Sequence, residues 1–164
     1  MPLPNQVLPG FSATLYCQPS ATPTALTTAN LSVYASVSAI AVSGNVLPVE
    51  SIPAFGQDDA SATFAVAGSR QSDIIPTQSK PTSMTITAAW NPSDPQLLLM
   101  RSDAYSGVID RTFVIGATDG TNDIYYAFNG RVSEFHIDMA PNAEAKCTFS
   151  VHPRGNQFGW SNNT

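Results

Sequence analysis

The sequence predicts a mainly β protein, a β-sandwich or partial barrel with one α-helix packed on its outside. Two observations carry this prediction. Most apolar residues alternate with Ser or Thr, which is the period of a strand with one buried face. A helical spacing occurs convincingly in one stretch alone, residues 93–107. Because 164 residues are enough to bury a core, we expect residues 1–155 to form a single domain.

The clearest unit is a strand followed by this helix. Met84, Ile86 and Ala88 alternate with small polar residues, which predicts a strand over residues 82–90 with one buried face. The helix that follows is expected to begin at a capping box formed by Ser93 and Gln96, with Pro95 in the first turn, and to end at Gly107.

The N-terminal part is expected to contain an arm at residues 1–11, a strand at 12–17 and a loop at 18–30. Alternating apolar and Ser residues then predict a long strand over 31–42. The turn residues that follow predict a hairpin with a returning strand over 46–52.

A long connection is expected over residues 53–80, with a short strand at 61–66 inside it. Connections of this length in a compact domain are usually functional or mobile.

The C-terminal part is expected to be a meander of strands. Residues 111–117 are apolar on both faces, and Asp119-Gly120 predicts a hairpin into a very long strand, 124–139. Its apolar phase changes from even to odd numbers, which predicts a bulge near 130–133. Residues 143–151 alternate cleanly, and residues 156–164 are expected to form a C-terminal tail.

Composition excludes several classes of protein. Charged residues make up only 12% of the chain, against about a quarter in an average soluble domain. A surface poor in charge is expected where copies of a chain cover one another, although an ordinary β-sandwich is also rich in Ser and Thr. The net charge of −5 argues against nucleic-acid binding. We expect no membrane span, no signal peptide, and two buried free thiols at Cys17 and Cys147.

No pattern in the sequence predicts catalysis, a cofactor or a metal. Motifs of nucleotide-binding loops, serine hydrolases and redox cysteines are missing, and His136 and His152 lack the spacing of metal ligands. Glu134, Asp138 and Glu144 could serve as paired carboxylates, but a solvated polar face explains them better.

The order and spacing of several segments resemble the major tail tube proteins of long-tailed bacteriophages, in particular the tube domain of the phage lambda protein. The resemblance covers residues 1–17 and 46–155. It is carried by these segments: the opening Met-Pro-Leu-Pro-Asn-Gln-Val-Leu-Pro-Gly, Thr14-Leu15-Tyr16, Val49-Glu50-Ser51-Ile52, Asp58-Asp59, Gly68, the strand Met84–Trp90 with its helix, the Asp119-Gly120 hairpin, Phe128 to Ser133, and Lys146 to Val151 with Pro153-Arg154-Gly155. The sequence does not include the immunoglobulin-like C-terminal domain of the lambda protein.

The resemblance implies a structural role in a virion tail. Tail tube proteins form hexameric rings that stack into a hollow tube, with strands of all subunits joined in one β-barrel and the helix outside. The implied partners are other copies of the chain, a tape-measure protein in the lumen, a tail terminator and tail-tip proteins. DNA would pass through without specific binding, after assembly of the tail in the host cytoplasm. An acidic lumen would repel passing DNA rather than hold it.

Two sets of site residues follow as hypotheses. The polar sides of the long strands are candidates to face the lumen, although the same faces could look outward: Ser36, Ser38, Glu134, His136, Asp138, Glu144 and Lys146. The 53–80 loop is the candidate for contacts between subunits or rings, through Asp58, Asp59 and Arg70.

Two alternatives stay open. The tube of a contractile tail or of a type VI secretion system would share the fold. A monomeric β-sandwich that binds a ligand or carbohydrate would instead need convergent aromatic residues, for which Trp90, Tyr125, Tyr126 and Trp160 are available.

Overall fold

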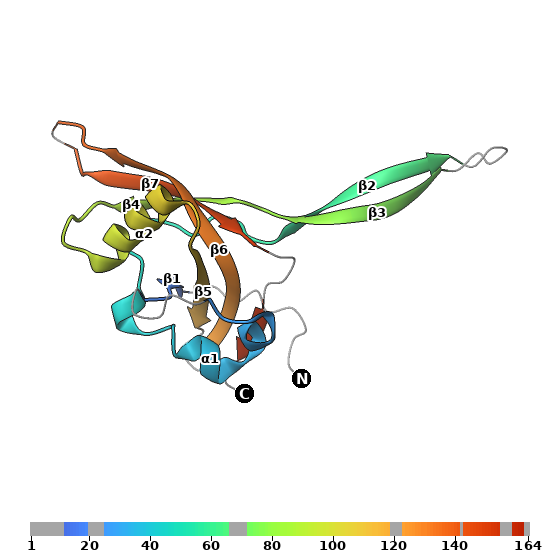
Figure 1. Cartoon of the computed structure of the whole chain (residues 1–164), viewed down its shortest axis with the longest axis horizontal. Coiled ribbons are helices and arrows are strands. Elements are labelled where there is room, and N and C mark those ends of the chain that lie inside the picture. The colour runs from blue at the N-terminus through green and yellow to red at the C-terminus, as the bar shows by residue number, and fades with distance from the viewer. Residues whose placement is uncertain are drawn as a thin grey trace, which may run out of the picture.

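Six strands form a curled antiparallel sheet, and a separate two-stranded hairpin projects from it (Figure 1). The computed structural model describes residues 12–19, 25–65, 72–118, 123–141, 143–154 and 159–162. Its elements are β1 (Ser12–Cys17), η1 (Thr28–Ser32), α1 (Tyr34–Ser38), η2 (Ser43–Asn45), β2 (Gln57–Ala65), β3 (Ser72–Pro81), β4 (Met84–Ala89), α2 (Pro95–Ser106), β5 (Asp110–Thr118), β6 (Asp123–Asp138), β7 (Lys146–Pro153) and β8 (Gly159–Asn162). The mainly β prediction is confirmed.

The sheet has the order β1-β5-β6-β7-β4, and β8 adds to the first half of β6. The segment 46–50 connects the two edge strands. The Leu47 amide donates to Leu15 O and the Glu50 amide donates to Thr87 O, both at 2.9 Å. The same short segment therefore spans from β1 to β4 and draws the sheet into a half-barrel.

The main core lies inside this curl. Phe113, Phe128 and Phe149 from three strands are fully buried there, together with Leu97 and Met100 of α2. Burying large side chains of this kind is worth about 1.5–3 kcal/mol each, so α2 is held on the sheet mainly by its apolar face. The alternation predicted for residues 84–88 and 147–151 is confirmed, because Met84, Ile86, Ala88, Cys147, Phe149 and Val151 are all in this core.

A second, smaller cluster lies on the opposite face of β5 and β6, where η1 and α1 cover the sheet. It consists of Leu31, Val37, Ile40, Val114 and Ala127. The strand predicted for 31–42 is wrong, because this region forms η1 and α1. Leu31 of η1 and Val37 of α1 are buried, whereas Ser32, Ala35 and Ser36 between them are not, and the Ser–Ala alternation suggested a strand instead.

The returning strand predicted for 46–52 is also wrong. Only isolated bridges form there, at Val46 and Val49. Pro48 lies between them and has no N–H to donate to a ladder. The long hairpin expected in this part of the chain therefore does not exist.

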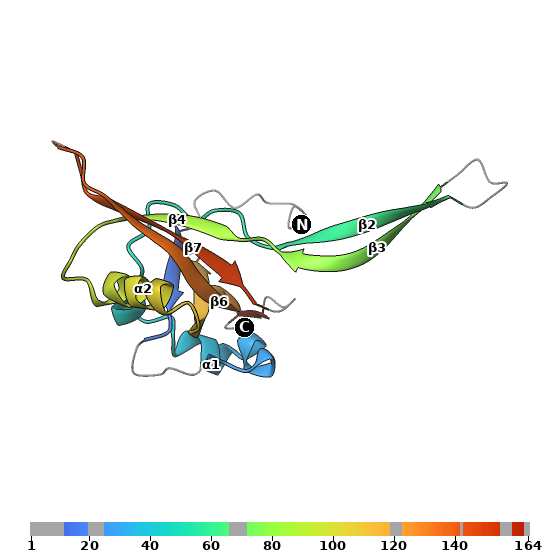
Figure 2. The ribbon, with the colours of Figure 1, turned by 45° about the horizontal axis from the view of Figure 1, so that its top comes forward.

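Instead, the chain forms its long hairpin where a loop was expected. β2 and β3 pair from Gln57–Pro81 at the base to Ala65–Ser72, with a register shift near Ala60 that accommodates Pro76. The two strands pack mainly on each other and extend away from the body in both views (Figures 1 and 2). The strand predicted at 61–66 overlaps the end of β2, whereas the rest of the hairpin was expected to be a loop.

Helix α2 begins one residue later than expected. Asp94, not Ser93, is its N-cap, and Asp94 Oδ1 accepts from the amides of Gln96 (2.8 Å) and Leu97 (3.3 Å). The Gln96 side chain is buried and donates to Gly44 O, so it does not complete the predicted capping box. The predicted stop is confirmed, since Gly107 adopts the left-handed conformation with φ 65°.

The predicted bulge in the long strand is present, slightly beyond its expected position. The β6–β7 register shifts between Ser133 and His136, and Glu134 has a positive φ of 57°. The extra residue turns Phe135 toward the core, where its ring stacks on Phe149 at 5.9 Å. The phase change in the sequence thus has a direct structural cause.

The predicted C-terminal tail is partly wrong, because residues 159–162 form β8 beside β6. Gly159 lies so close to η1 that an added Cβ would be 2.1 Å from Leu31 O. No other residue fits there without a shift of the main chain. The predicted arm, 1–11, lies outside the described residues.

Candidate assembly surfaces

One polar sheet face collects most of the predicted lumen residues. His136, Asp138 and Lys146 lie on paired positions of β6 and β7, on the face of the sheet opposite the main core. Glu134 joins them, because its carboxylate accepts a hydrogen bond from Ser150 Oγ at 3.0 Å. Glu144 is exposed just before β7 begins. We call this surface of β6 and β7 the polar face.

Ser36 and Ser38 do not belong to the polar face. They lie on α1, which packs over the first half of β6 with Val37 turned inward. The prediction that they lie on a long strand is therefore wrong, because the predicted strand 31–42 does not form.

Hydrogen bonds between side chains order the polar face. His152 lies between two serine hydroxyls, with Nε2 at 2.7 Å from Ser133 Oγ and Nδ1 at 3.0 Å from Ser83 Oγ. This arrangement joins β6, β7 and the start of β4. Lys146 pairs with Glu50, and this hydrogen bond and charge raise the pKa of the Lys146 ammonium group. The face is therefore tied together by polar contacts where it lacks apolar packing.

The second predicted site is the 53–80 segment, which is now the β2–β3 hairpin. Asp58 is exposed near its base and accepts from Thr82 Oγ1 at 3.1 Å. Asp59 is one residue further along β2, and Arg70 lies outside the described residues. Each strand of the hairpin has one edge that the described sheet does not pair. Such edges are ready to pair with another chain.

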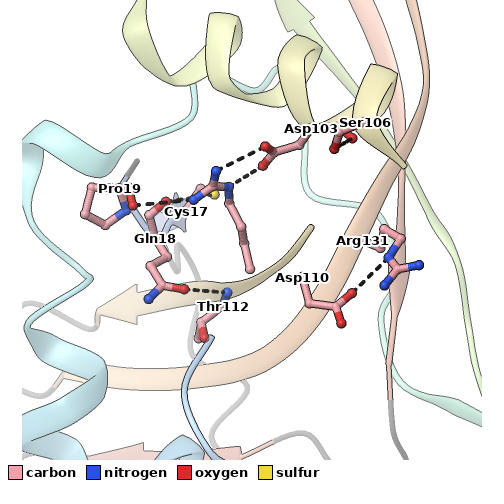
Figure 3. A network of polar contacts seen from close by, with 9 residues as sticks. Cys17, Gln18, Pro19, Asp103, Ser106, Asp110, Thr112 and Arg131 are labelled. Atoms are coloured by element: carbon pink, nitrogen blue, oxygen red, sulfur yellow. Dashed lines mark hydrogen bonds and ion pairs between the residues drawn. The ribbon is translucent and has the colours of Figure 1, made fainter. Parts of the chain in front are cut away.

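A buried ion pair, which sequence reasoning did not identify, fastens α2 to the sheet (Figure 3). Arg111 of β5 makes two hydrogen bonds to Asp103 of α2, through Nε and through NH2, and both residues are almost fully buried. The Asp103 hydrogen bond raises the pKa of Arg111. Nearby, Gln18 Oε1 accepts from the Thr112 amide at 3.2 Å. Asp103 lies within the predicted helix and Arg111 begins a predicted strand that is otherwise apolar. These two charged residues were the only sequence signals that could have indicated the ion pair.

Both cysteines are free and buried, as predicted. Burial raises the pKa of the Cys17 thiol strongly, and burial also raises the pKa of Cys147. A thiol with a raised pKa is a poor nucleophile at neutral pH. These residues therefore act as small core side chains.

The aromatic residues available for a ligand site do not converge. Trp90 packs on Phe135 and Tyr126 on Phe55 beside the main core, whereas Tyr125 belongs to the second cluster and Trp160 is 53% exposed. Tyr125 and Tyr16 do line a shallow depression of about 80 Å³, which is too small for a sugar ring surrounded by contacts.

Within the described ranges, no three His, Cys, Asp or Glu side chains gather as a metal site would require. The helices in that same part of the chain are all too short or too polar to cross a membrane.

Comparisons with known proteins identify the fold. No family model and no curated protein matches the sequence. A chain in the sheath/tube terminator of an extracellular contractile injection system, PVC, matches with a TM-score of 0.63 and 10% identity, over 99% of both chains. A chain of the anti-feeding prophage baseplate matches with a TM-score of 0.64 and 9% identity, over 99% of this chain and 97% of that chain. The SPP1 tail tube matches with a TM-score of 0.54 and 10% identity, over 92% of this chain and 76% of that one. The mainly β, curled half-barrel sheet with few helices therefore matches the folds of tail tube and tube terminator proteins.

Proposed function

We propose that this chain is the tube subunit of a long-tailed bacteriophage, and that copies form hexameric rings which stack into a hollow conduit for genome delivery. The observation that carries the proposal is the β2–β3 hairpin. Two strands of nine and ten residues extend from the body and pack mainly on each other. An isolated two-stranded hairpin is marginally stable in water, so its natural setting is a contact with other copies.

The polar face supplies the second part of the proposal. It lies on the side of the sheet away from the core and is ordered by Glu134, Lys146, His152 and their partners. In the assembled tube, this face would line the lumen, with Asp138 and Glu144 at its rim. A lumen with surplus carboxylates would let DNA pass without holding it.

The partners follow from the same role. Besides its own copies, the chain would contact a tape-measure protein inside the lumen, and terminator and tip proteins at the two ends of the tube. Asp58, Asp59 and Arg70 on the hairpin segment would contribute polar contacts between subunits or rings. The protein would assemble in the host cytoplasm and remain in the virion tail.

A second candidate is a ring of a contractile injection system. The matches to the terminator and baseplate chains have TM-scores of 0.63 and 0.64, above the 0.54 of the SPP1 tube. The higher scores favour this second candidate as an alternative to the phage tube. It predicts single rings or short stacks rather than long tubes.

Negative-stain electron microscopy of the purified protein over a concentration series tests both candidates. Six-fold rings that lengthen into hollow tubes are expected for a tube subunit, and rings that do not lengthen are expected for the second candidate, a single ring of a contractile injection system. Because tube proteins can need an initiator, the same protein is also sought in purified tail particles. Monomers at every concentration, together with its absence from those particles, would overturn the proposal.

A further inference from the structure

The surface beside the C-terminal end of α2 combines exposed apolar side chains with surplus positive charge. Tyr105 and Val108 are 77% and 71% exposed. Arg131 binds Asp110 through Nε at 3.0 Å and Val108 O through NH2 at 3.1 Å. Arg154 lies 3.6 Å from the other Asp110 oxygen, so one carboxylate serves two guanidinium groups. We call Tyr105, Val108, Arg131 and Arg154 the basic end.

The free end of the β6–β7 pair has the complementary character. Ile137 and Met139 are 36% and 67% exposed at this end of the strand pair. Asp138 and Glu144 are exposed at the same end, with Asp138 on the polar face and Ile137 on the other face of the strand, and neither carboxylate has an ion pair among the described residues. We call Ile137, Asp138, Met139 and Glu144 the acidic tip.

The acidic tip and the basic end cannot meet within one chain. Arg131 and Asp138 are seven residues apart along β6, a separation of roughly 20 Å in an extended strand. The tip projects from the body in both views of the ribbon (Figures 1 and 2). In the monomer each surface therefore exposes apolar area beside a surplus of one sign of charge, and the two surfaces have opposite signs.

We propose that the acidic tip of one copy docks on the basic end of a second copy, in a head-to-tail contact that repeats through the assembly. This inference rests on the proposed self-assembly and names the residues that carry it. The two surfaces differ, so the contact is heterologous and can close into a ring or propagate along a stack. Exposed apolar residues would form its centre, and the carboxylates and guanidinium groups would fix its direction.

Cysteine cross-linking tests the contact directly, because the native thiols Cys17 and Cys147 are buried and leave little background. The variant Val108→Cys/Met139→Cys is treated with a short bismaleimide. It is expected to give a ladder of dimers and higher multiples. The matched control is Val42→Cys/Met139→Cys, in which Val42 is 47% exposed on another part of the surface. It is expected to give no ladder.

The same samples are examined by electron microscopy, so that the outcomes can be separated. Rings or tubes without a ladder, or a ladder no stronger than that of the control, would overturn the docking contact and leave the tube proposal standing. Neither assemblies nor a ladder would count against both.

Charge reversal provides a second, independent readout. Arg154→Glu alone, and Asp138→Lys/Glu144→Lys alone, should each lower the assembled fraction by about tenfold, because like charges then face each other. Mixing the two variants should restore assembly, since the intact tip of one meets the intact end of the other and the two reversed surfaces match. Asn30→Glu, on an exposed residue of η1, should have no effect. Failure of the mixture to recover while the control assembles would contradict the contact.

Discussion

At the scale of single residues, the least expected feature is the buried pair of Arg111 and Asp103. Removing two charges from water costs several kcal/mol, which the fork-shaped contact between guanidinium and carboxylate must offset. Such a pair adds little net stability, but it does define where α2 lies on β5. Removing the ion pair therefore lowers stability strongly only when one of the two charged residues is left buried without its partner.

We predict that Asp103→Ala lowers the free energy of unfolding by about 3–5 kcal/mol, because Arg111 is left buried without a partner. The double variant Asp103→Leu/Arg111→Met should lose much less. Urea denaturation followed by circular dichroism gives both values. Equal losses in the single and double variants would show that packing, and not the uncompensated charge, sets the cost.

A second residue-scale prediction concerns Tyr125. Burial, followed by the nearby Asp123, Tyr34 and Tyr16, raises the pKa of Tyr125 from 10.0 to about 12. Between these values the folded state keeps a proton that the unfolded state has lost. This contribution to stability is therefore intact below pH 10 and is lost as the pH rises toward 12.

Absorbance titration at 295 nm should accordingly show one tyrosine that ionises late, and Tyr125→Phe should remove that step. Tyr105→Phe is the matched control, since Tyr105 is 77% exposed. A late step that persists in Tyr125→Phe would assign the raised pKa to another residue.

At the scale of elements, the start of α2 depends on a single side chain. Asp94 accepts from two amides that have no partner within the helix. We predict that Asp94→Ala destabilises the protein by about 1 kcal/mol, whereas Ser93→Ala changes stability by only a few tenths, because Ser93 is not the cap. Thermal denaturation of both variants shows which residue caps the helix. A larger loss of stability in Ser93→Ala than in Asp94→Ala would instead support the capping box predicted at Ser93.

The hairpin is the element on which the proposed function depends most. Replacing residues 60–78 by an Asn-Gly turn would join Asp59 to Ser79, which are paired partners near its base. Because β2 and β3 pack mainly on each other, the body should keep its near-native melting temperature. Assembly into rings or tubes should be lost. A shortened protein that still forms tubes would show that the hairpin is dispensable.

At the scale of the whole molecule, the orientation of the polar face in the tube can be measured. We predict that His136→Cys, on the polar face, reacts with a bulky maleimide in monomers. In tubes this cysteine should be protected, because the polar face is proposed to line the lumen. A cysteine at the exposed Ser102 of α2 should react in both states. The reverse pattern would place the polar face outside the tube.

Sequence patterns among neighbouring residues predicted an element correctly where it buries one face, or where it ends at a residue such as glycine that adopts a left-handed conformation. The alternation at Met84, Ile86 and Ala88, the left-handed stop at Gly107 and the phase change in β6 each follow from neighbouring residues alone. The two buried thiols and the mainly β class were predictable for the same reason. The order of these features along the chain carried the resemblance to tail tube proteins. Four of the residues predicted to face the lumen do lie together on β6 and β7: Glu134, His136, Asp138 and Lys146.

The remaining features depend on contacts between segments that are far apart in the sequence. Residues 28–38 form η1 and α1, and with them Leu31, Val37 and Ile40 cover the face of β5 and β6 opposite the main core. The local pattern of Ser and Ala does not indicate this long-range contact. The strands of the β2–β3 hairpin contact mainly each other and not the body, so the alternation of a buried and an exposed face was not available to predict the whole hairpin. The pairing of Arg111 with Asp103 joins an interior strand to a helix through the core. The spacing of apolar residues thus predicts which segments can bury a face, whereas the three-dimensional packing sets which surfaces stay exposed, because it depends on contacts between segments far apart in the chain.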